Sequence, residues 1–442
     1  MADVPPVVSG HIPVLGHFAE FVRQPIELLK RGQREAGNAF SLKLPGRTTV
    51  VLLGSAYSRF FFAETDKTLS IGSAYPFFGR MFAPDFYFIG NQVEYKKQRD
   101  IVLPRFRGSQ LDGYVAAMES ETDAFIRRIG DIGEFDLTHE LGPLVMRIAA
   151  RAFLGEDFGR RMNSDFFAEF REFSKGIDFF TPSWLPLPHM IRSKRARNRL
   201  RRALGAMIHE RRERPVDPSD FLQSLVEATF DDGEPLSELL LINFILFFTW
   251  AGHETTAGHL SWALIDLLTN PGELVRVRAE VDSVTANGLP VSVTTLKSLP
   301  HLDNCLHETE RLHPIAHLLA RQATETIELD GHLIPKGSTV MIAPSVSHRL
   351  ESEYSRPGEF YPDRYLATPK ERYSLIGFGG GVHRCIGVHF AYSEMKVVLT
   401  KLFQRYSFEL LDENPTSVAG NRSKWPASPC RVRFHRRVDR EE

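Results

Sequence analysis

Cysteine is scarce in this chain of 442 residues, which contains only Cys305, Cys385 and Cys430. Three cysteines are too few for a disulfide framework, and they lack the spacing of cysteine-based zinc motifs. The N-terminus has no apolar segment of the kind found in signal peptides, and the longest apolar run, residues 239–251, is too short to span a bilayer. We therefore expect a cytoplasmic protein without a membrane anchor.

An excess of either charge is also lacking, because 54 lysines and arginines face 55 aspartates and glutamates, for a net charge of -1. Nucleic-acid binding depends on a strong positive field, so the composition predicts no nucleic-acid partner. The basic run at residues 192–202 allows two interpretations, a nucleic-acid patch or a solvated helix face whose aliphatic stems pack on the protein. We adopt the second.

The apolar periodicity predicts a mainly α protein of the α+β type, with a small sheet. Residues 39–44 and 48–53 alternate around a Pro-Gly turn and are typical of strands, as are parts of residues 320–342. Residues 54–314 are mostly helical in pattern, and another helix and a short β tail follow residue 387. Because the strands come from both ends of the chain, we expect one interwoven domain over residues 1–442.

One predicted helix, residues 236–268, is apolar on nearly every face and about 50 Å long at about 1.5 Å per residue. Such a helix is typical of the core of a large protein. Its middle, residues 251–256, reads Ala-Gly-His-Glu-Thr-Thr and places a carboxylate and two hydroxyls in apolar surroundings. Burying these groups is costly without a partner. This segment alone allows two interpretations, a local kink in the helix or a functional site.

A second segment, residues 378–387, has three consecutive glycines followed by Cys385 just before a predicted helix that begins near Ile386. Glycines allow close approach of the backbone to a flat group, and a helix N-terminus stabilises a thiolate. A phosphate-binding loop is a poor alternative because no Lys-Ser/Thr pair ends it. A buried structural cysteine is the other alternative, whereas haem ligation by a thiolate would use every feature of the segment.

This segment resembles the haem-binding signature of the cytochrome P450 superfamily, Phe-x-x-Gly-x-(Arg/His)-x-Cys-x-Gly. The signature is matched at Phe378, Gly381, His383, Cys385 and Gly387. Residues 251–256 are similar to the central-helix motif of the family, and residues 308–311 to its Glu-x-x-Arg motif. The resemblance extends over essentially the whole chain. It implies the P450 fold, in which a large helical part with a long central helix over the haem joins a small β-rich part, with no fused reductase.

The resemblance implies haem b as cofactor, with Cys385 as the iron ligand. It assigns the haem propionates to His383, Arg99, Arg321 and Tyr95, and further haem contacts to Phe378, Gly379, Ala251 and Gly387. Surface basic residues are the ordinary alternative for the propionate set. It also implies a buried charge network of Glu308, Arg311 and Arg364 that locks the haem loop, for which a surface ion pair is the alternative.

The resemblance also implies a monooxygenase that uses O₂ and two electrons from a separate partner, for which we expect a ferredoxin and its reductase. Thr255 would hydrogen-bond the oxygen that the haem activates, and Glu254 would relay protons through water. Ala251 and Gly252 would leave room above the iron. A basic face around Arg384 and Lys396 would receive the electron donor.

Among P450s, the chain is most similar to the bacterial sterol 14α-demethylase branch, for example in the Ala-Tyr-Pro-Phe-Phe stretch at residues 74–78. That branch typically carries histidine where this chain has Glu254. The expected pocket residues, all aromatic, imidazole or aliphatic, are Tyr75, Phe77, Phe78, Phe86, Phe88, His253, His317 and Leu318; a plain aromatic core is the alternative. Aromatic walls suit a bulky sterol, terpenoid or similar lipid, with sterol 14α-demethylation as one candidate reaction. Hydroxylation of a non-sterol secondary metabolite or a fatty acid is the alternative, followed by a non-catalytic haem sensor.

Overall fold

The structure, a computed structural model, describes residues 3–83, 86–87, 89–107, 110–155, 164–176, 187–286, 290–367, 371, 373–419 and 423–437. The chain divides into two compact units. The first, which we call the strand-bearing unit, comprises Met1–Ala74, Thr122–Gly142 and Thr255–Glu442. The second, the helical unit, comprises Tyr75–Glu121 and Pro143–Glu254. That the chain works as a single P450 domain stays a prediction.

The strand-bearing unit holds the described strands. They are β1 (Ala39–Leu44), β2 (Arg47–Leu52), β3 (Leu69–Ser70), β4 (Ile132–Asp136), β5 (Leu319–Ala323), β6 (Ile327–Leu329), β7 (His332–Ile334), β8 (Thr339–Ile342), β9 (Tyr406–Leu410) and β10 (Arg431–Arg436). Its helices are α1 (Phe18–Arg23), α2 (Pro25–Ala36), α3 (Ser55–Ala63), α13 (Pro271–Thr285), α14 (Val293–Lys297), α15 (Pro300–Leu312), α16 (Pro344–Ser347), α17 (Arg364–Ala367), the 3₁₀ helix η2 (Gly381–His383) and α18 (Val388–Arg405).

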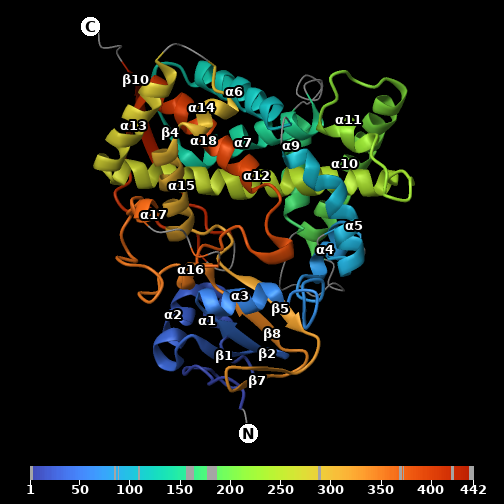
Figure 1. Ribbon diagram of the computed structural model, residues 1–442, viewed down its shortest axis with the longest axis vertical. Coiled ribbons are helices and arrows are strands. Elements are labelled where there is room, and N and C mark those ends of the chain that lie inside the picture. Colours follow the sequence, from blue (N-terminus) through green and yellow to red (C-terminus); the bar gives the residue numbers. More distant parts are fainter. Residues whose placement is uncertain are drawn as a thin grey trace. The chain divides into compact units, whose positions relative to one another are not determined.

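The larger sheet joins the two ends of the chain, in the order β1-β2-β8-β5-β3. Strand β2 runs parallel to β8, with Val50 opposite Val340, so strands near residue 50 and residue 340 lie side by side (Figure 1). The run Val50-Val51-Leu52-Leu53 is apolar on both sides of the strand, and its members enter two different buried clusters. A strand with this pattern is covered on both faces. The predicted meeting of the two chain ends is therefore confirmed.

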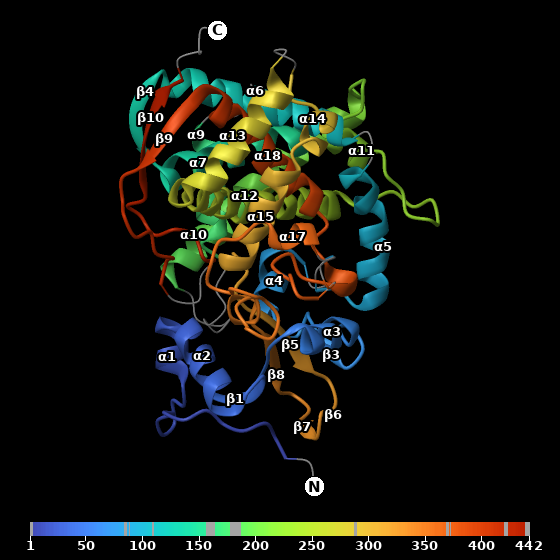
Figure 2. The same ribbon diagram turned by 60° about the vertical axis from the view of Figure 1, so that its left-hand side comes forward.

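A smaller sheet in the order β4-β10-β9 pairs the predicted β tail with β4, a strand that was not predicted because it lies within residues 54–314, which are mostly helical in pattern. Strand β10 lies between its two neighbours (Figure 2). Val432 is paired with Phe135 of β4 on one side and with Leu410 of β9 on the other. Strands β6 and β7 form a separate hairpin across the turn at Asp330 and Gly331. The strand segments predicted from the sequence are thus confirmed.

The helical unit contains α4 (Pro76–Met81), α5 (Gln92–Val102), the 3₁₀ helix η1 (Leu103–Phe106), α9 (Ser164–Ser174), α10 (Pro188–Glu213) and α11 (Phe221–Val226). Helices α6 (Gln110–Ile129) and α7 (Leu137–Leu154) have residues in both units. The basic run lies on α10, where Arg197 donates to the carbonyl of Arg80, Arg201 donates to that of Phe82, and Arg199 pairs with Glu169. These arginines thus pack on the protein, as the second interpretation expects.

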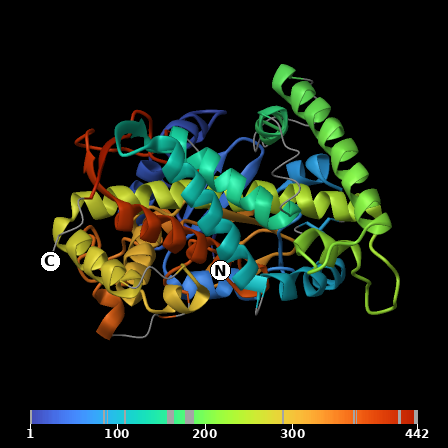
Figure 3. The same cartoon turned by 90° about the horizontal axis from the view of Figure 1, so that it is seen from above.

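The long apolar helix is α12 (Glu238–Thr269), close to the predicted bounds. It is helical without interruption through residues 251–256 (Figure 3), so the Ala-Gly-His-Glu-Thr-Thr stretch does not end the helix. The helix begins in the helical unit and ends in the strand-bearing unit. Among the residues described, no helix is long and apolar enough to cross a membrane.

Candidate active site

The glycine loop before Cys385 packs directly on α3. A Cβ atom at Gly380 would lie 2.6 Å from the Phe62 ring, and one at Gly381 would lie 2.9 Å from the Phe62 carbonyl oxygen. Gly379 and Gly381 also have φ angles of 70° and 63°, which side chains other than glycine rarely adopt. The loop is closed by a hydrogen bond of 2.9 Å from the Cys385 N–H to the Phe378 carbonyl. Gly380 and Gly381 are therefore required because a side chain at either position would clash with Phe62. A Cβ at Gly379 would meet only the His383 carbonyl oxygen, 3.7 Å away.

Cys385 keeps an exposed surface although protein atoms surround much of it. These atoms raise the pKa of its thiol, whereas a hydrogen bond from the Gly387 N–H and the charge of Arg384 lower it. Helix α18 begins at Val388, so the prediction of a start near Ile386 is wrong by two residues, because Gly387 occupies the cap position. Support for a thiolate thus comes from the Gly387 N–H and Arg384, just ahead of the helix.

His383 is oriented by Asp66, a residue that follows α3. The His383 Nε2 atom lies 2.5 Å from Asp66 Oδ2, and both side chains are almost completely buried. Asp66 has a φ of 66°, which turns the chain so that its carboxylate reaches the haem-signature loop. The sequence analysis did not identify Asp66, and the expected contact of His383 with a propionate stays a prediction.

The Glu308–Arg311–Arg364 network forms as predicted. Arg311 Nε and Nη2 lie 2.9 and 2.8 Å from the two Glu308 oxygens, and both side chains have no exposed surface. Arg364 Nε lies 3.0 Å from each of the same oxygens. Arg311 also donates through Nη1 to the carbonyls of His348 and Pro357 and through Nη2 to that of Glu359. A buried ion pair is stable only when its remaining hydrogen-bonding groups are satisfied, and Arg311 meets that condition here.

His348 connects this network to the loop. Its carbonyl accepts from Arg311, and its Nε2 accepts from the Ile376 N–H at 3.0 Å, two residues before Phe378. A neutral imidazole is needed for this acceptance, and burial together with the charge of Arg311 lowers the pKa of His348 to about 3. The network thus acts on the Cys385 loop through one histidine that sequence reasoning missed.

A second support reaches the loop from Glu310. The Tyr392 hydroxyl donates to Glu310 Oε2 at 2.6 Å, and a Cβ at Gly377 would lie 2.7 Å from the Glu310 side chain. The Phe378, Tyr392 and His259 rings form one cluster, with centroid distances of 5.5 Å from Phe378 to Tyr392, 6.1 Å from Phe378 to His259 and 6.0 Å from His259 to Tyr392. Phe378 thus packs on two neighbouring rings within the strand-bearing unit.

Stability is expected to fall below neutral pH. Burial lowers the pKa of His253 and His259 to about 4 and of His348 to about 3, from 6.5, while burial raises the pKa of Glu394 well above 4.5. Between pH 5.5 and 4.5, unfolding therefore lets three histidines take up nearly one proton each while Glu394 releases up to one, a net uptake of about two protons. The free energy of unfolding should fall by about 2.7 kcal/mol per pH unit as the pH drops. Urea unfolding across this range tests the slope, and a flat profile contradicts it.

The remaining predicted residues of the strand-bearing unit lie on or near β5. The Arg321 guanidinium is buried, donates to Thr65 Oγ1 at 3.1 Å and stacks over the Phe61 ring at 4.8 Å. His317 is buried and its carbonyl accepts from Ser345 Oγ. Leu318 packs against a hydrophobic cluster that includes strands β1 and β2. The structure therefore does not test their roles toward haem or substrate.

In the helical unit, Tyr95 and Arg99 share helix α5. Tyr95 is buried, with its ring 5.2 Å from that of Tyr87. The Nε atom of Arg99 is buried, and no described residue accepts a hydrogen bond from it. An orphaned guanidinium N–H fits an anionic partner that the protein itself does not supply.

The predicted pocket residues of the helical unit form an aromatic cluster. Phe77 and Phe78 are buried and stacked at 4.5 Å, and Phe86 is buried and stacked on Phe82 at 5.0 Å. Tyr75 is half-buried and contacts Phe77 and Phe78 edge-on, while Phe88 lies outside the described residues. These rings form part of a core, the ordinary alternative, and their role as pocket walls stays a prediction.

The central-helix motif lies on α12, and the roles assigned to Ala251, Glu254 and Thr255 stay predictions. Thr255 is exposed, and Ala251, His253 and Glu254 are half-buried. Gly252, expected to leave room above the iron, instead faces α7, where a Cβ would lie 3.3 Å from the Phe153 ring. The glycine thus allows α7 and α12 to pack closely within the helical unit.

The expected docking face around Arg384 and Lys396 is only half present. Arg384 is exposed, but the Lys396 ammonium is paired with Asp303 at 3.0 Å and donates to the Leu296 carbonyl, with 13% of its side chain exposed. Lys396 therefore ties α18 to α14 and α15 and is not a free surface cation. The prediction for Lys396 is wrong.

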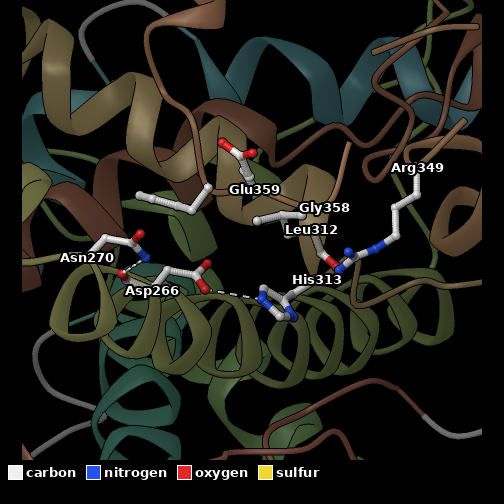
Figure 4. Close-up of a pocket in the computed structure, with 8 residues that line it drawn as sticks. Asp266, Asn270, Leu312, His313, Arg349, Gly358 and Glu359 are labelled. Carbon is white, nitrogen blue, oxygen red and sulfur yellow. Dashed lines mark hydrogen bonds and ion pairs between the residues drawn. The ribbon is translucent and has the colours of Figure 1, made fainter. Parts of the chain in front are cut away.

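A cavity of about 460 Å³ lies at the C-terminal ends of α12 and α15 (Figure 4). Its lining residues are Asp266, Asn270, Leu312, His313, Arg349, Gly358, Glu359 and Phe360. Asp266 pairs with His313 at 3.1 Å, and the His313 ring stacks on Trp262. This polar wall includes none of the predicted pocket residues and abuts the network, since Arg311 donates to the Glu359 carbonyl.

Comparisons with known proteins find similar sequences and a similar structure over nearly the whole length of this chain. A family model described as "Cytochrome P450" matches residues 5–431. The sterol 14alpha-demethylase of Mycolicibacterium vanbaalenii is 32% identical over 98% of both chains. The lanosterol 14-alpha demethylase of Homo sapiens is 29% identical over 98% of this chain and 87% of its own. A solved structure of a cyanobacterial CYP120A1 with retinoic acid bound has a TM-score of 0.88 and 27% identity, covering 99% of this chain and 100% of that one.

Proposed function

Because the chain belongs to the cytochrome P450 family and is thus a haem monooxygenase, we propose that it hydroxylates a bulky apolar lipid of the sterol or terpenoid class. The observation that carries this proposal is the similarity, over 98% of the chain, to enzymes named for sterol demethylation. The structural neighbour holds retinoic acid, also an apolar lipid. Alternative substrates are a fatty acid or a non-sterol secondary metabolite.

The residues described fit a thiolate-ligated haem. Cys385 has an accessible thiol that accepts a hydrogen bond from the Gly387 N–H. Arg99 has a buried Nε–H group for which no described residue is an acceptor. Haem with a thiolate ligand supplies O₂ activation, because the thiolate favours O–O cleavage. We assign the ligand role to Cys385 and propionate binding to Arg99, with His383 and Arg321 as further candidates.

Proton delivery is assigned to Thr255 and Glu254. Thr255 is exposed on α12 and holds a proton on its hydroxyl, while Glu254 replaces that proton through water. Replacing Thr255 with alanine is expected to lower product formed per electron consumed by about 100-fold, with substrate binding retained. The buried neighbour Thr256, changed to serine, is the matched control and should behave as wild type. Full coupling in Thr255→Ala contradicts the assignment.

Sterol 14α-demethylation is the second candidate, favoured by the 32% identity to a demethylase. Against it stands Glu254, at a position where that branch typically carries histidine. Titration of the haem-loaded protein with 14-methyl sterols and with non-sterol terpenoids separates the candidates through the low-spin to high-spin shift. A shift with terpenoids alone excludes demethylation, and no shift with either class contradicts the proposed substrate class.

The family requires O₂ and an electron donor. We propose a separate ferredoxin with its reductase, which approaches the exposed Arg384. Because the field of a single arginine is small, the association should weaken only modestly as salt rises.

A further inference from the structure

A cluster of metal-binding side chains lies between α13 and α15, outside the Cys385 loop. Glu273 comes from the first turn of α13, and His301 and Cys305 come from α15. Their carboxylate oxygen, imidazole nitrogen and sulfur atoms all lie within 4.8 Å of one another. No other group of three such residues with this spacing occurs among the residues that the structure describes.

The distances are close to those of a tetrahedral zinc site. His301 Nε2 lies 2.9 Å from Glu273 Oε2 and 3.7 Å from Cys305 Sγ. With Zn–N and Zn–O bonds of about 2.0 Å and a Zn–S bond of about 2.3 Å, tetrahedral angles require N···O and N···S separations of about 3.3 and 3.5 Å. Shifts of a few tenths of an ångström would therefore bring His301 Nε2 to zinc-site separations from both other atoms, and the Glu273 oxygen and the Cys305 sulfur already lie within 4.8 Å of each other.

Local structure holds these side chains in position. His301 and Cys305 are four residues apart, so they project from the same face of α15. Glu280, also on α13, accepts hydrogen bonds from the backbone N–H groups of His301 and Leu302 at 2.8 and 2.9 Å. The helix that carries two of the ligands is thus anchored to the helix that carries the third.

The charges around the cluster favour a cation. Arg276 pairs with the carboxylate of Glu273 and is held on Asp363 by two hydrogen bonds, while the Glu280 carboxylate also acts on the Cys305 thiol. Arg276 can release Glu273 without losing its partner Asp363. Burial and the Glu273 and Glu280 carboxylates raise the pKa of the Cys305 thiol, so only a bound cation would make its thiolate stable.

We propose that Glu273, His301 and Cys305 bind Zn²⁺, or a divalent transition metal of similar chemistry, with water as a fourth ligand. Binding displaces the Cys305 thiol proton to solvent, as expected for a thiolate ligand. His301 and Glu273 keep 12% and 21% of their side chains exposed, which leaves a route for the ion. The ion would tie α13 to α15, the helix that also carries Glu308 and Arg311.

Zinc binding to the haem-loaded protein, with Cys385 occupied by iron, tests this proposal. We expect one Zn²⁺ per chain in competition with a chromophoric chelator, and a Zn K-edge absorption spectrum with one sulfur at about 2.3 Å. Cys305→Ser should lose that sulfur and bind at least about tenfold more weakly, while Cys430→Ser, a change at another buried cysteine, should leave both unchanged. The affinity for zinc should fall as the pH is lowered, because about one proton is released for each ion bound.

The half-buried Glu273 gives a second variant in case Cys305→Ser does not fold. Glu273→Gln should weaken binding at least about tenfold and keep the sulfur in the zinc shell. The proposal is overturned if wild type binds no stoichiometric zinc, if its zinc shell holds only nitrogen and oxygen, or if Cys305→Ser retains wild-type affinity. These readouts do not depend on monooxygenase activity.

Discussion

Cys385→Ser is expected to reduce monooxygenase activity more than about 100-fold and to remove the thiolate signature from the ferrous–CO spectrum. Loss of an outer-shell partner of a metal costs about 10–100-fold, so loss of the ligand itself should cost more. A serine hydroxyl stays protonated at neutral pH and cannot donate charge as a thiolate does. Product formation and the CO spectrum of the variant, measured on equal amounts of folded protein, provide the check.

Cys430→Ser is the matched control for this prediction, because Cys430 is buried beside the small sheet and lies far from the loop in sequence. It should retain the wild-type spectrum. If Cys385→Ser kept the thiolate spectrum while Cys430→Ser lost it, Cys385 would not be the ligand.

Arg311→Ala is expected to lower the free energy of unfolding by about 3–5 kcal/mol and to leave most of the protein without haem. The change leaves the Glu308 charge buried with Arg364 as its main counter-ion and deprives three carbonyls of their donor. Removing one partner of a fully buried ion pair has a cost of this size. Because His348 links Arg311 to Ile376, the disturbance reaches the Cys385 loop.

Urea unfolding and the haem-to-protein ratio measure this effect. Arg433→Ala is the control, since Arg433 forms half-exposed ion pairs with Glu134 and Glu409, worth less than about 1 kcal/mol. Equal losses in both variants would mean that the buried network has no special role.

Much of the fold could be predicted because strong local patterns and the tertiary structure agree. Local sequence alone is enough to recognise the apolar run of α12, the alternation of apolar and polar residues in β1 and the Pro-Gly turn after it. The P450 resemblance, also confirmed, rests on motifs of a few residues each, and two glycines of the haem signature, Gly379 and Gly381, have positive φ angles that favour glycine.

The residues that sequence reasoning missed act through long-range contacts. Asp66 meets His383 across 317 positions, and His348 meets Ile376 through a buried imidazole, yet neither stands in a motif. Gly252 has a structural role that only its neighbour Phe153 reveals. Lys396 looked like a surface cation because its partner Asp303 lies on a different helix. Spacing along the chain does not contain such information.

The central claim, that Cys385 holds the haem iron as a thiolate, is tested most directly by the ferrous–CO difference spectrum of the purified wild-type protein. The account predicts a Soret maximum at the red-shifted position of a thiolate–iron–CO complex. A maximum at the position of imidazole-ligated haem, in folded protein with one haem per chain, would contradict it.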